Sequence, residues 1–115
     1  MSRKTGPSPT IVGLVLARSA GICEVCGLAW ATNVHHRKNR SGGGTWAVSN
    51  LLHLCGSGTT GCHGVITCKP WEIEARPNGL TVHPNHEPAA VPVRLLGDWW
   101  LLDDHGDKYP TEAPS

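Results

Sequence analysis

The chain has 115 residues and a formal net charge of +1, which is enough material for one small domain. It contains no Phe and one Met, and 14 glycines and nine prolines interrupt it, so little remains to fill a large apolar core and a metal staple is expected. No apolar run approaches the roughly 20 residues of a membrane span, which argues against a membrane role. The opening residues, MSRKTGPSPT, lack the apolar segment of a signal peptide, and we therefore expect a cytoplasmic protein.

Charge is distributed unevenly along the chain. Residues 1–70 carry seven lysines and arginines and one acid, whereas residues 71–115 carry three lysines and arginines and eight acids. A polyanion would be attracted to the first part and repelled by the second, so any chemistry on nucleic acid is expected in the first part. Ordinary scatter of charge is the alternative explanation.

The first predicted element is a helix. Residues 1–9 are polar, basic and proline-containing, and we expect a disordered lead there, ahead of a single domain at 10–106. The apolar spacing over 10–20 predicts a helix with Thr10 as its N-cap, and Gly21 is a typical stop signal.

Short strands and loops are expected next. A β-like stretch ends at Arg37, a glycine loop occupies 41–44, and 46–54 is expected to return as a loop and short strand. A second helix, of about ten to fifteen residues, is predicted to open at Cys62 and to end before the turn at 77–79.

The end of the domain is expected to form β-structure. Residues 80–82 and the run 91–102 read as strands of a C-terminal sheet or hairpin. The tail, 107–115, is predicted to be disordered.

Four of the five cysteines form two pairs. Cys23 and Cys26 make a C-x-x-C knuckle, while Cys55 and Cys62 are separated by a flexible six-residue spacer. In a reducing compartment such pairs are typical of thiolate metal ligands, and structural Zn²⁺ takes four of them in a tetrahedron. Buried free thiols are the alternative. Cys68 is left over and is expected to be a small apolar helix residue.

The polar residues between and beside the cysteines follow a specific order. His35 and His36 come after the first cysteine pair, Asn50 follows, and His63 directly follows the last ligand cysteine. Together with the cysteines and the Leu-Leu-x-Leu-Cys run, this order resembles the HNH, or His-Me finger, endonuclease family over 23–64.

The resemblance implies an α+β fold with a ββα-metal core, a four-cysteine structural zinc site, an N-terminal helix and C-terminal β-strands. Residues 78–82 and 99–106 are also similar to the C-terminal sheets of phage-encoded members. The implied activity is metal-dependent hydrolysis of DNA phosphodiester bonds.

The resemblance also implies roles for the four polar residues. His36 would deprotonate the attacking water, because a neutral imidazole titrates near neutral pH. His35 and His63 would hold one divalent cation, which requires a bend in the chain at the His pair, since neighbouring side chains of a strand point to opposite faces. Asn50 would hydrogen-bond to the backbone and fix the loop that carries His36.

One departure from the family pattern bears on the cation. Several members carry another His one helical turn after the first helix ligand, whereas this chain has Thr67. Fewer nitrogen ligands favour Mg²⁺ or Mn²⁺ over Ni²⁺ or Zn²⁺. The long spacer within the second cysteine pair is a further departure, which leaves the loop geometry open.

A basic run follows the His pair. Arg37, Lys38 and Arg40 are expected to hold phosphates that flank the cleavage site, and a solvated charge run is the alternative. Similarity to phage-encoded members implies DNA and the terminase or packaging machinery as partners, in the host cytoplasm, although restriction and homing enzymes use the same core. A second class of function stays open: a zinc-stapled nucleic-acid or protein binding module on an HNH scaffold that does not cut.

Overall fold

The computed structural model describes residues 8–114, which begin with helix α1 (Pro9–Ser19). Ser8 is the N-cap, because its hydroxyl accepts a hydrogen bond from the backbone N–H of Ile11 at 3.2 Å. The helix ends at Ala20, whose left-handed conformation (φ 56°) lets its N–H bond back into the last turn.

The predicted helix is therefore confirmed, but its start is not. The cap is Ser8 rather than Thr10, because a proline at the first helical position is already favourable and Ser8 directly precedes it. Residues 1–7 of the expected lead lie outside the described residues, and residues 8 and 9 of that lead belong to the helix start.

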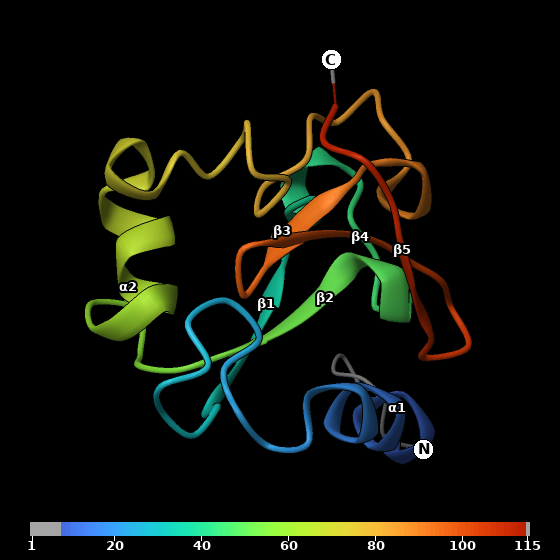
Figure 1. The fold of residues 1–115 in the computed structure, drawn as a ribbon, viewed down its shortest axis with the longest axis horizontal. Helices are drawn as coiled ribbons and strands as arrows, with labels where there is room; N and C mark the ends of the chain where they lie inside the picture. The colour runs from blue at the N-terminus through green and yellow to red at the C-terminus, as the bar shows by residue number, and fades with distance from the viewer. Residues whose placement is uncertain (1–7, 115) are drawn as a thin grey trace.

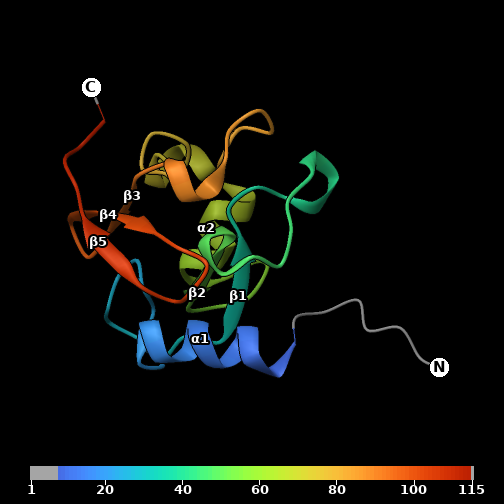
Figure 2. The same ribbon diagram turned by 90° about the vertical axis from the view of Figure 1, so that its right-hand side faces the viewer.

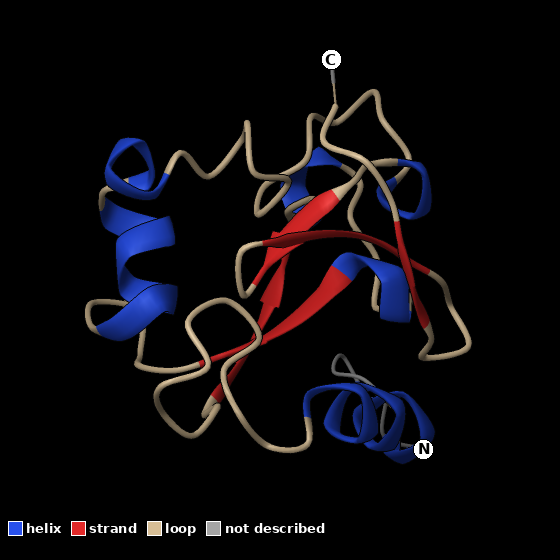
Figure 3. Ribbon diagram, in the orientation of Figure 1, coloured by secondary structure: helices blue, strands red, loops and turns tan. Residues whose placement is uncertain are grey.

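The described strands form two small antiparallel sheets (Figures 1 and 3). The first sheet pairs two strands, and the second is a three-stranded meander. The strands are β1 (Asn33–His36), β2 (Leu51–Leu54), β3 (Val93–Leu95), β4 (Asp98–Leu102) and β5 (Lys108–Pro110).

Helix α2 (Gly61–Cys68) follows β2 and lies at the left of Figure 1, while α1 lies below the sheets. Four single-turn 3₁₀ helices complete the described elements: η1 (Arg40–Gly42), η2 (Val48–Asn50), η3 (Pro70–Ile73) and η4 (Pro88–Ala90). The protein is thus an α+β fold, as expected from the sequence.

Helix α2 is shorter than predicted. It ends at Cys68, and the chain tightens into η3 from Pro70 onward. Proline has no N–H to continue the α-helical ladder and disfavours helical geometry in the residue before it, so the long helix expected from the sequence is split in two.

The strands predicted over 91–102 are confirmed as the hairpin β3–β4. Its turn residues Leu96 and Gly97 both have positive φ (52° and 85°), as in the primed turns that suit the twist of a two-residue hairpin. The strand predicted at 80–82 is wrong. The N–H groups of Leu80 and Thr81 both donate to the carbonyl of Ala75, so this segment forms a tight turn and joins no ladder.

The disordered tail predicted at 107–115 is corrected at 108–110, and residue 115 of that tail lies outside the described residues. Residues 108–110 form β5, paired with β4 in the register Leu102↔Lys108 and Trp100↔Pro110. The Lys108 ammonium lies 4.5 Å from the centre of the Trp100 ring, a cation–π contact that adds to the pairing.

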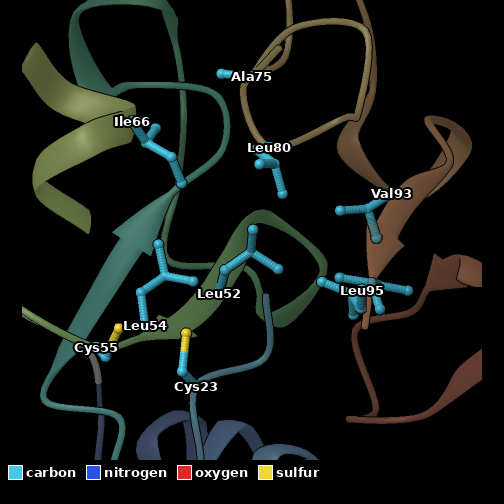
Figure 4. Close-up of a cluster of buried hydrophobic side chains, with 10 residues drawn as sticks. Cys23, Leu52, Leu54, Cys55, Ile66, Ala75, Leu80, Val93 and Leu95 are labelled. Carbon is cyan, nitrogen blue, oxygen red and sulfur yellow. The ribbon is translucent and has the colours of Figure 1, made fainter. Parts of the chain in front are cut away.

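The main apolar core lies between the two sheets and α2 (Figure 4). Its buried members come from the cysteine pairs, β2, α2, the 75–80 turn and the second sheet: Cys23, Leu52, Leu54, Cys55, Ile66, Ala75, Leu80, Val93, Leu95 and Leu102. A smaller cluster of Val15, Val48 and Leu51 attaches α1 to the other face of β2, and Figure 2 shows α1 running beneath β1. Burying apolar side chains on both faces fixes the β1–β2 sheet that carries the His pair.

Candidate functional site

The four paired cysteines converge on one point. The sulfur atoms of Cys23, Cys26, Cys55 and Cys62 all lie within 4.8 Å of one another, and those of Cys26 and Cys55 are 3.9 Å apart. A tetrahedron of thiolates with Zn–S bonds of about 2.3 Å has sulfur atoms about 3.8 Å apart. The cluster is therefore compatible with a structural metal such as zinc, as predicted from the sequence.

Hydrogen bonds to sulfur hold the ligands in place. The N–H of Leu28 donates to the sulfur of Cys26 at 3.4 Å, and the N–H of Cys62 donates to that of Cys55, also at 3.4 Å. Figure 4 places Cys23 and Cys55 at one end of the main core, next to Leu54. The four-cysteine cluster and the apolar core are thus one packed unit.

The long spacer of the second pair folds back on itself. A Cβ on Gly56 would lie 2.0 Å from the carbonyl oxygen of Thr60, and a Cβ on Gly61 would lie 2.7 Å from the Cα of Gly56. Only glycine permits this approach, which pinches residues 57–60 out as a loop. Cys55 and Cys62 consequently face the same centre despite the spacer.

The thiols do not ionise alike. Burial alone would raise the pKa of Cys23, but hydrogen bonds from the backbone N–H groups of Cys26, Cys55 and Val25 lower that pKa to about 7. Burial raises the pKa of Cys62, with the nearby Cys23 thiolate adding to the effect. A bound dication would remove the mutual repulsion that keeps all four from ionising together. Cys68, by contrast, is exposed at the end of α2 and lies outside the cluster.

His35 has one ring nitrogen committed to the protein. Its Nε2 lies 2.8 Å from the carbonyl oxygen of Leu80. Because a carbonyl only accepts, Nε2 carries the proton and Nδ1 keeps its lone pair. Burial lowers the pKa of His35 to about 4, so the ring is neutral at pH 7. A neutral imidazole oriented by a backbone carbonyl is the usual arrangement of a metal-ligating histidine.

His63 lies beside His35. The two ring centroids are 5.6 Å apart, in an edge-on arrangement. His63 Nδ1 is buried and has no hydrogen-bond partner among the described residues. Such an atom costs about 1–3 kcal/mol unless something binds it.

His36 faces a different neighbour. Its ring packs edge-on against Trp46, with centroids 4.3 Å apart, and its Nε2 is likewise buried without a hydrogen-bond partner among residues 8–114. Burial, with a smaller contribution from the charge of Arg40, lowers its pKa below the ordinary value. The ring is therefore neutral near pH 7, the form that can accept a proton.

The bend expected at the His pair lies one residue later. Strand pairing continues through both histidines, with His35 opposite Leu52 and His36 opposite Leu51. The chain bends only at 37–38. The two side chains take different neighbours, His63 for His35 and Trp46 for His36, yet both line one cleft.

Asn50 makes the backbone contacts expected of it. Its side-chain oxygen accepts a hydrogen bond from the N–H of Lys38 at 2.8 Å, and its side-chain nitrogen donates to the carbonyls of Lys38 and Thr45 at 3.0 Å each. The residue is 1% exposed. Asn50 therefore closes the 38–50 loop and holds the end of the strand that carries His36.

Arg37 is not a phosphate contact, which corrects the sequence prediction. Its side chain is 1% exposed, and its guanidinium donates to the carbonyls of Ser49, Gly79, Pro88 and Val91 at 2.7–3.0 Å. These hydrogen bonds join the end of β1 to three distant segments. The planar fork of arginine makes such a multiple contact possible, and none of its charge is presented to solvent.

Replacing Arg37 by alanine is expected to lower the free energy of unfolding by about 3–5 kcal/mol, because the carbonyls of Ser49, Gly79 and Val91 lose the guanidinium as their donor, while that of Pro88 keeps the N–H of Val91. Arg37→Lys should restore only part of the lost free energy of unfolding, since an ammonium cannot reach four carbonyls in a plane. Urea unfolding followed by circular dichroism measures the difference. Arg40→Ala, at an exposed residue, is the control and should change stability by less than about 0.5 kcal/mol. An Arg37→Ala variant with a nearly unchanged free energy of unfolding would contradict this structural role.

The other two basic residues are accessible. Lys38 is half-buried, with its ammonium 3.3 Å from the carbonyl of His86. Arg40 is exposed, and its guanidinium lies 5.9 Å from the centre of the Trp46 ring. Both cations remain candidates for phosphate contacts beside His36.

A cleft of about 730 Å³ opens next to the His pair. The end of β1 lines it with His35 and His36, and residues of α2 and η3 line it as well. Further lining residues, which the sequence prediction did not single out, are Trp71, Glu74, Arg76 and Thr81. Trp46 was missed as well. A tryptophan inside the segment predicted as the second helix was the one available signal for Trp71.

Comparisons with protein-family models, with curated proteins and with solved structures found no match to the chain. In the described part of the chain, no helix has both the length and the apolar character needed to cross a membrane. The established features are therefore an α+β fold, a four-cysteine cluster compatible with a structural metal, and a cleft bordered by histidines.

Proposed function

We propose that the protein is a metal-dependent HNH endonuclease that hydrolyses DNA phosphodiester bonds. In this proposal β1, β2 and α2 form the ββα-metal core, and the four cysteines hold structural Zn²⁺. The observation that carries the proposal is the pair of buried imidazole nitrogens without partners, His36 Nε2 and His63 Nδ1. Proteins rarely leave such atoms unpaired unless a ligand or reactant meets them.

His36 is the proposed general base. Its depressed pKa keeps it neutral near pH 7, and the unpartnered Nε2 is free to take a proton from water as the water oxygen attacks phosphorus. The phosphorus–oxygen bond to the leaving sugar oxygen then breaks. Trp46 packs against the ring and Asn50 closes the loop behind it, so the base is held in one orientation.

His35 and His63 fit a divalent cation. The Nε2–H of His35 donates to the carbonyl of Leu80, which leaves the lone pair of its Nδ1 available. The Nδ1 of His63 has no hydrogen-bond partner among the described residues. When bound there, Mg²⁺ or Mn²⁺ would stabilise charge on the phosphate and the leaving oxygen. Two nitrogen ligands leave positions for water and phosphate, which favours these harder cations over Ni²⁺ or Zn²⁺.

The test is cleavage of supercoiled plasmid after the protein has been freed of loosely bound cations by gel filtration rather than by a chelator, which would also attack the cysteine cluster. Added Mg²⁺ or Mn²⁺ should produce nicked or linear DNA. His63→Ala should raise the cation concentration for half-maximal rate by at least about tenfold, since even indirect supports of a metal ligand contribute that much.

The matched control is His105→Ala, an exposed histidine in the β4–β5 loop, which should leave the cation dependence unchanged. Absence of cleavage with every cation would rule out the endonuclease and favour the binding module that keeps the scaffold without cutting. Cleavage whose cation dependence is the same in His63→Ala would remove His63 from the cation site. A role with phage packaging proteins in a host cytoplasm remains part of the proposal and is tested by co-purification with a terminase.

A further inference from the structure

The wall of the cleft that α2 and η3 supply carries an exposed aromatic side chain. Trp71 lies in η3, directly after the helix that bears His63, and it lines the same cleft as His35 and His36. Its side chain is 71% exposed. An indole left in water forgoes the burial that favours large apolar side chains, so a fixed and exposed tryptophan beside a cleft calls for an occupant.

The backbone under Trp71 is firmly held. The N–H of Ala75 donates to the carbonyl of Pro70 at 3.0 Å and closes the η3 turn, and Ala75 itself belongs to the main core at 2% exposure. Lys69 and Glu72 add an ion pair at 3.7 Å across the start of the same turn. The indole is therefore presented from a rigid element rather than from a free loop.

The charges of this wall are mixed. Arg76 lines the cleft and uses its Nε to donate to the hydroxyl of Thr81, which leaves its other donors available for a phosphate. Glu74 lines the cleft as well and repels phosphates nearby. Because these charges oppose each other, attraction at this wall has to include a contact that is not ionic.

We propose that Trp71 stacks on an unpaired base of the DNA strand, so that the cleft accepts single-stranded or locally unpaired DNA next to the cleavage point. This inference rests on the proposed function and adds a substrate class to it. Base–aromatic stacking does not depend on sequence, because every base has a π-face. In a duplex both faces of each base are covered by its neighbours, so only an unpaired base can meet the indole.

The experiment is fluorescence anisotropy with a labelled single-stranded oligonucleotide and with the matching duplex, without added divalent cation so that no cleavage occurs. Trp71→Ala should weaken binding of the single strand by about 5- to 150-fold, the range measured for one stacked base. Duplex affinity should stay unchanged. Trp71→Phe, which keeps an aromatic face, should retain most of the affinity, and Trp71→Leu, which keeps an apolar side chain, should behave like Trp71→Ala.

Two further variants separate stacking from other contacts. Trp30 is 74% exposed but does not line this cleft, so Trp30→Ala is the matched control and should bind as the parent does. The dependence of affinity on salt should keep its slope in Trp71→Ala, because no charge is removed. Arg76→Ala should flatten the slope by about one unit if Arg76 holds a phosphate.

Three results would overturn the proposal. The first is an unchanged affinity of Trp71→Ala for the single strand, and the second is an equal loss of affinity for single strand and duplex. The third is an equal loss of single-strand affinity in Trp30→Ala. Failure of this inference is distinguishable from failure of the proposed function. If Trp71→Ala loses single-strand affinity but the parent protein does not cut DNA with any cation, the endonuclease proposal fails and the stacking site is supported. If cleavage depends on His36 and Trp71→Ala binds the single strand as the parent does, the endonuclease proposal is supported and the stacking site is rejected.

Discussion

Replacing His36 by alanine is expected to lower the rate of DNA cleavage by about two to four orders of magnitude, the usual contribution of a positioned general base. DNA affinity and metal content should stay close to those of the parent. The fold should survive, because the variant removes a buried nitrogen that has no hydrogen-bond partner among the described residues, while it gives up the edge contact with Trp46. The measurement is single-turnover cleavage with saturating Mn²⁺ or Mg²⁺.

The dependence of that rate on pH gives a second readout. A base works in its neutral form, so the parent's rate should rise with pH through the pKa of His36 and level off above it. Because burial and Arg40 lower this pKa, the midpoint of the rise should lie below the ordinary histidine value of about 6.5. Arg40→Ala removes a cation that disfavours the protonated ring, so it should raise the pKa and move the rise to higher pH.

The control for His36 follows from its surroundings. His105→Ala replaces an exposed histidine that does not line the cleft shared by His35 and His36, and it should cleave as the parent does. If His36→Ala cuts DNA at the parent rate, another residue is the base and the proposed mechanism fails. A loss of activity accompanied by unfolding would instead assign His36 a packing role against Trp46.

Replacing Cys62 by serine is expected to release the structural metal and unfold the domain. Binding of zinc to four thiolates contributes an apparent 10–16 kcal/mol or so in small domains, whereas the whole stability of such a domain is about 5–15 kcal/mol. The cluster also joins the 23–26 knuckle, the end of β2 and the start of α2, and two of its cysteines belong to the main core. Losing one ligand therefore loosens three segments at once.

Zinc content by elemental analysis and thermal unfolding by circular dichroism test this expectation. Cys68→Ser provides the matched control, because Cys68 is an exposed thiol on the same helix and outside the cluster. It should keep both the metal and the melting temperature. A chelator-treated parent that contains no metal and melts at its original temperature would show that the four thiols do not staple the fold.

The amino-acid sequence by itself determined the features that depend on neighbours along the chain. The Cys23-x-x-Cys26 knuckle, the first helix and the β3–β4 hairpin were all predicted, because spacing, capping residues and glycine turns act over a few residues. The second cysteine pair was predicted too, although its looped geometry was not. That geometry depends on two glycines that approach each other across the loop.

Only the tertiary structure decided the role of Arg37 and the setting of the histidines. In the sequence Arg37 belongs to a basic run, but its carbonyl partners lie 12 to 54 residues away, and only packing brings them within reach. The carbonyl that orients His35 comes from Leu80, in a segment that looked like a strand and folds as a turn. Strand β5 was also missed, because residues 108–110 become a strand only by pairing with β4. Local pattern predicts which groups can bind a metal or move a proton, whereas burial and long-range hydrogen bonds decide which of them are left free to do so.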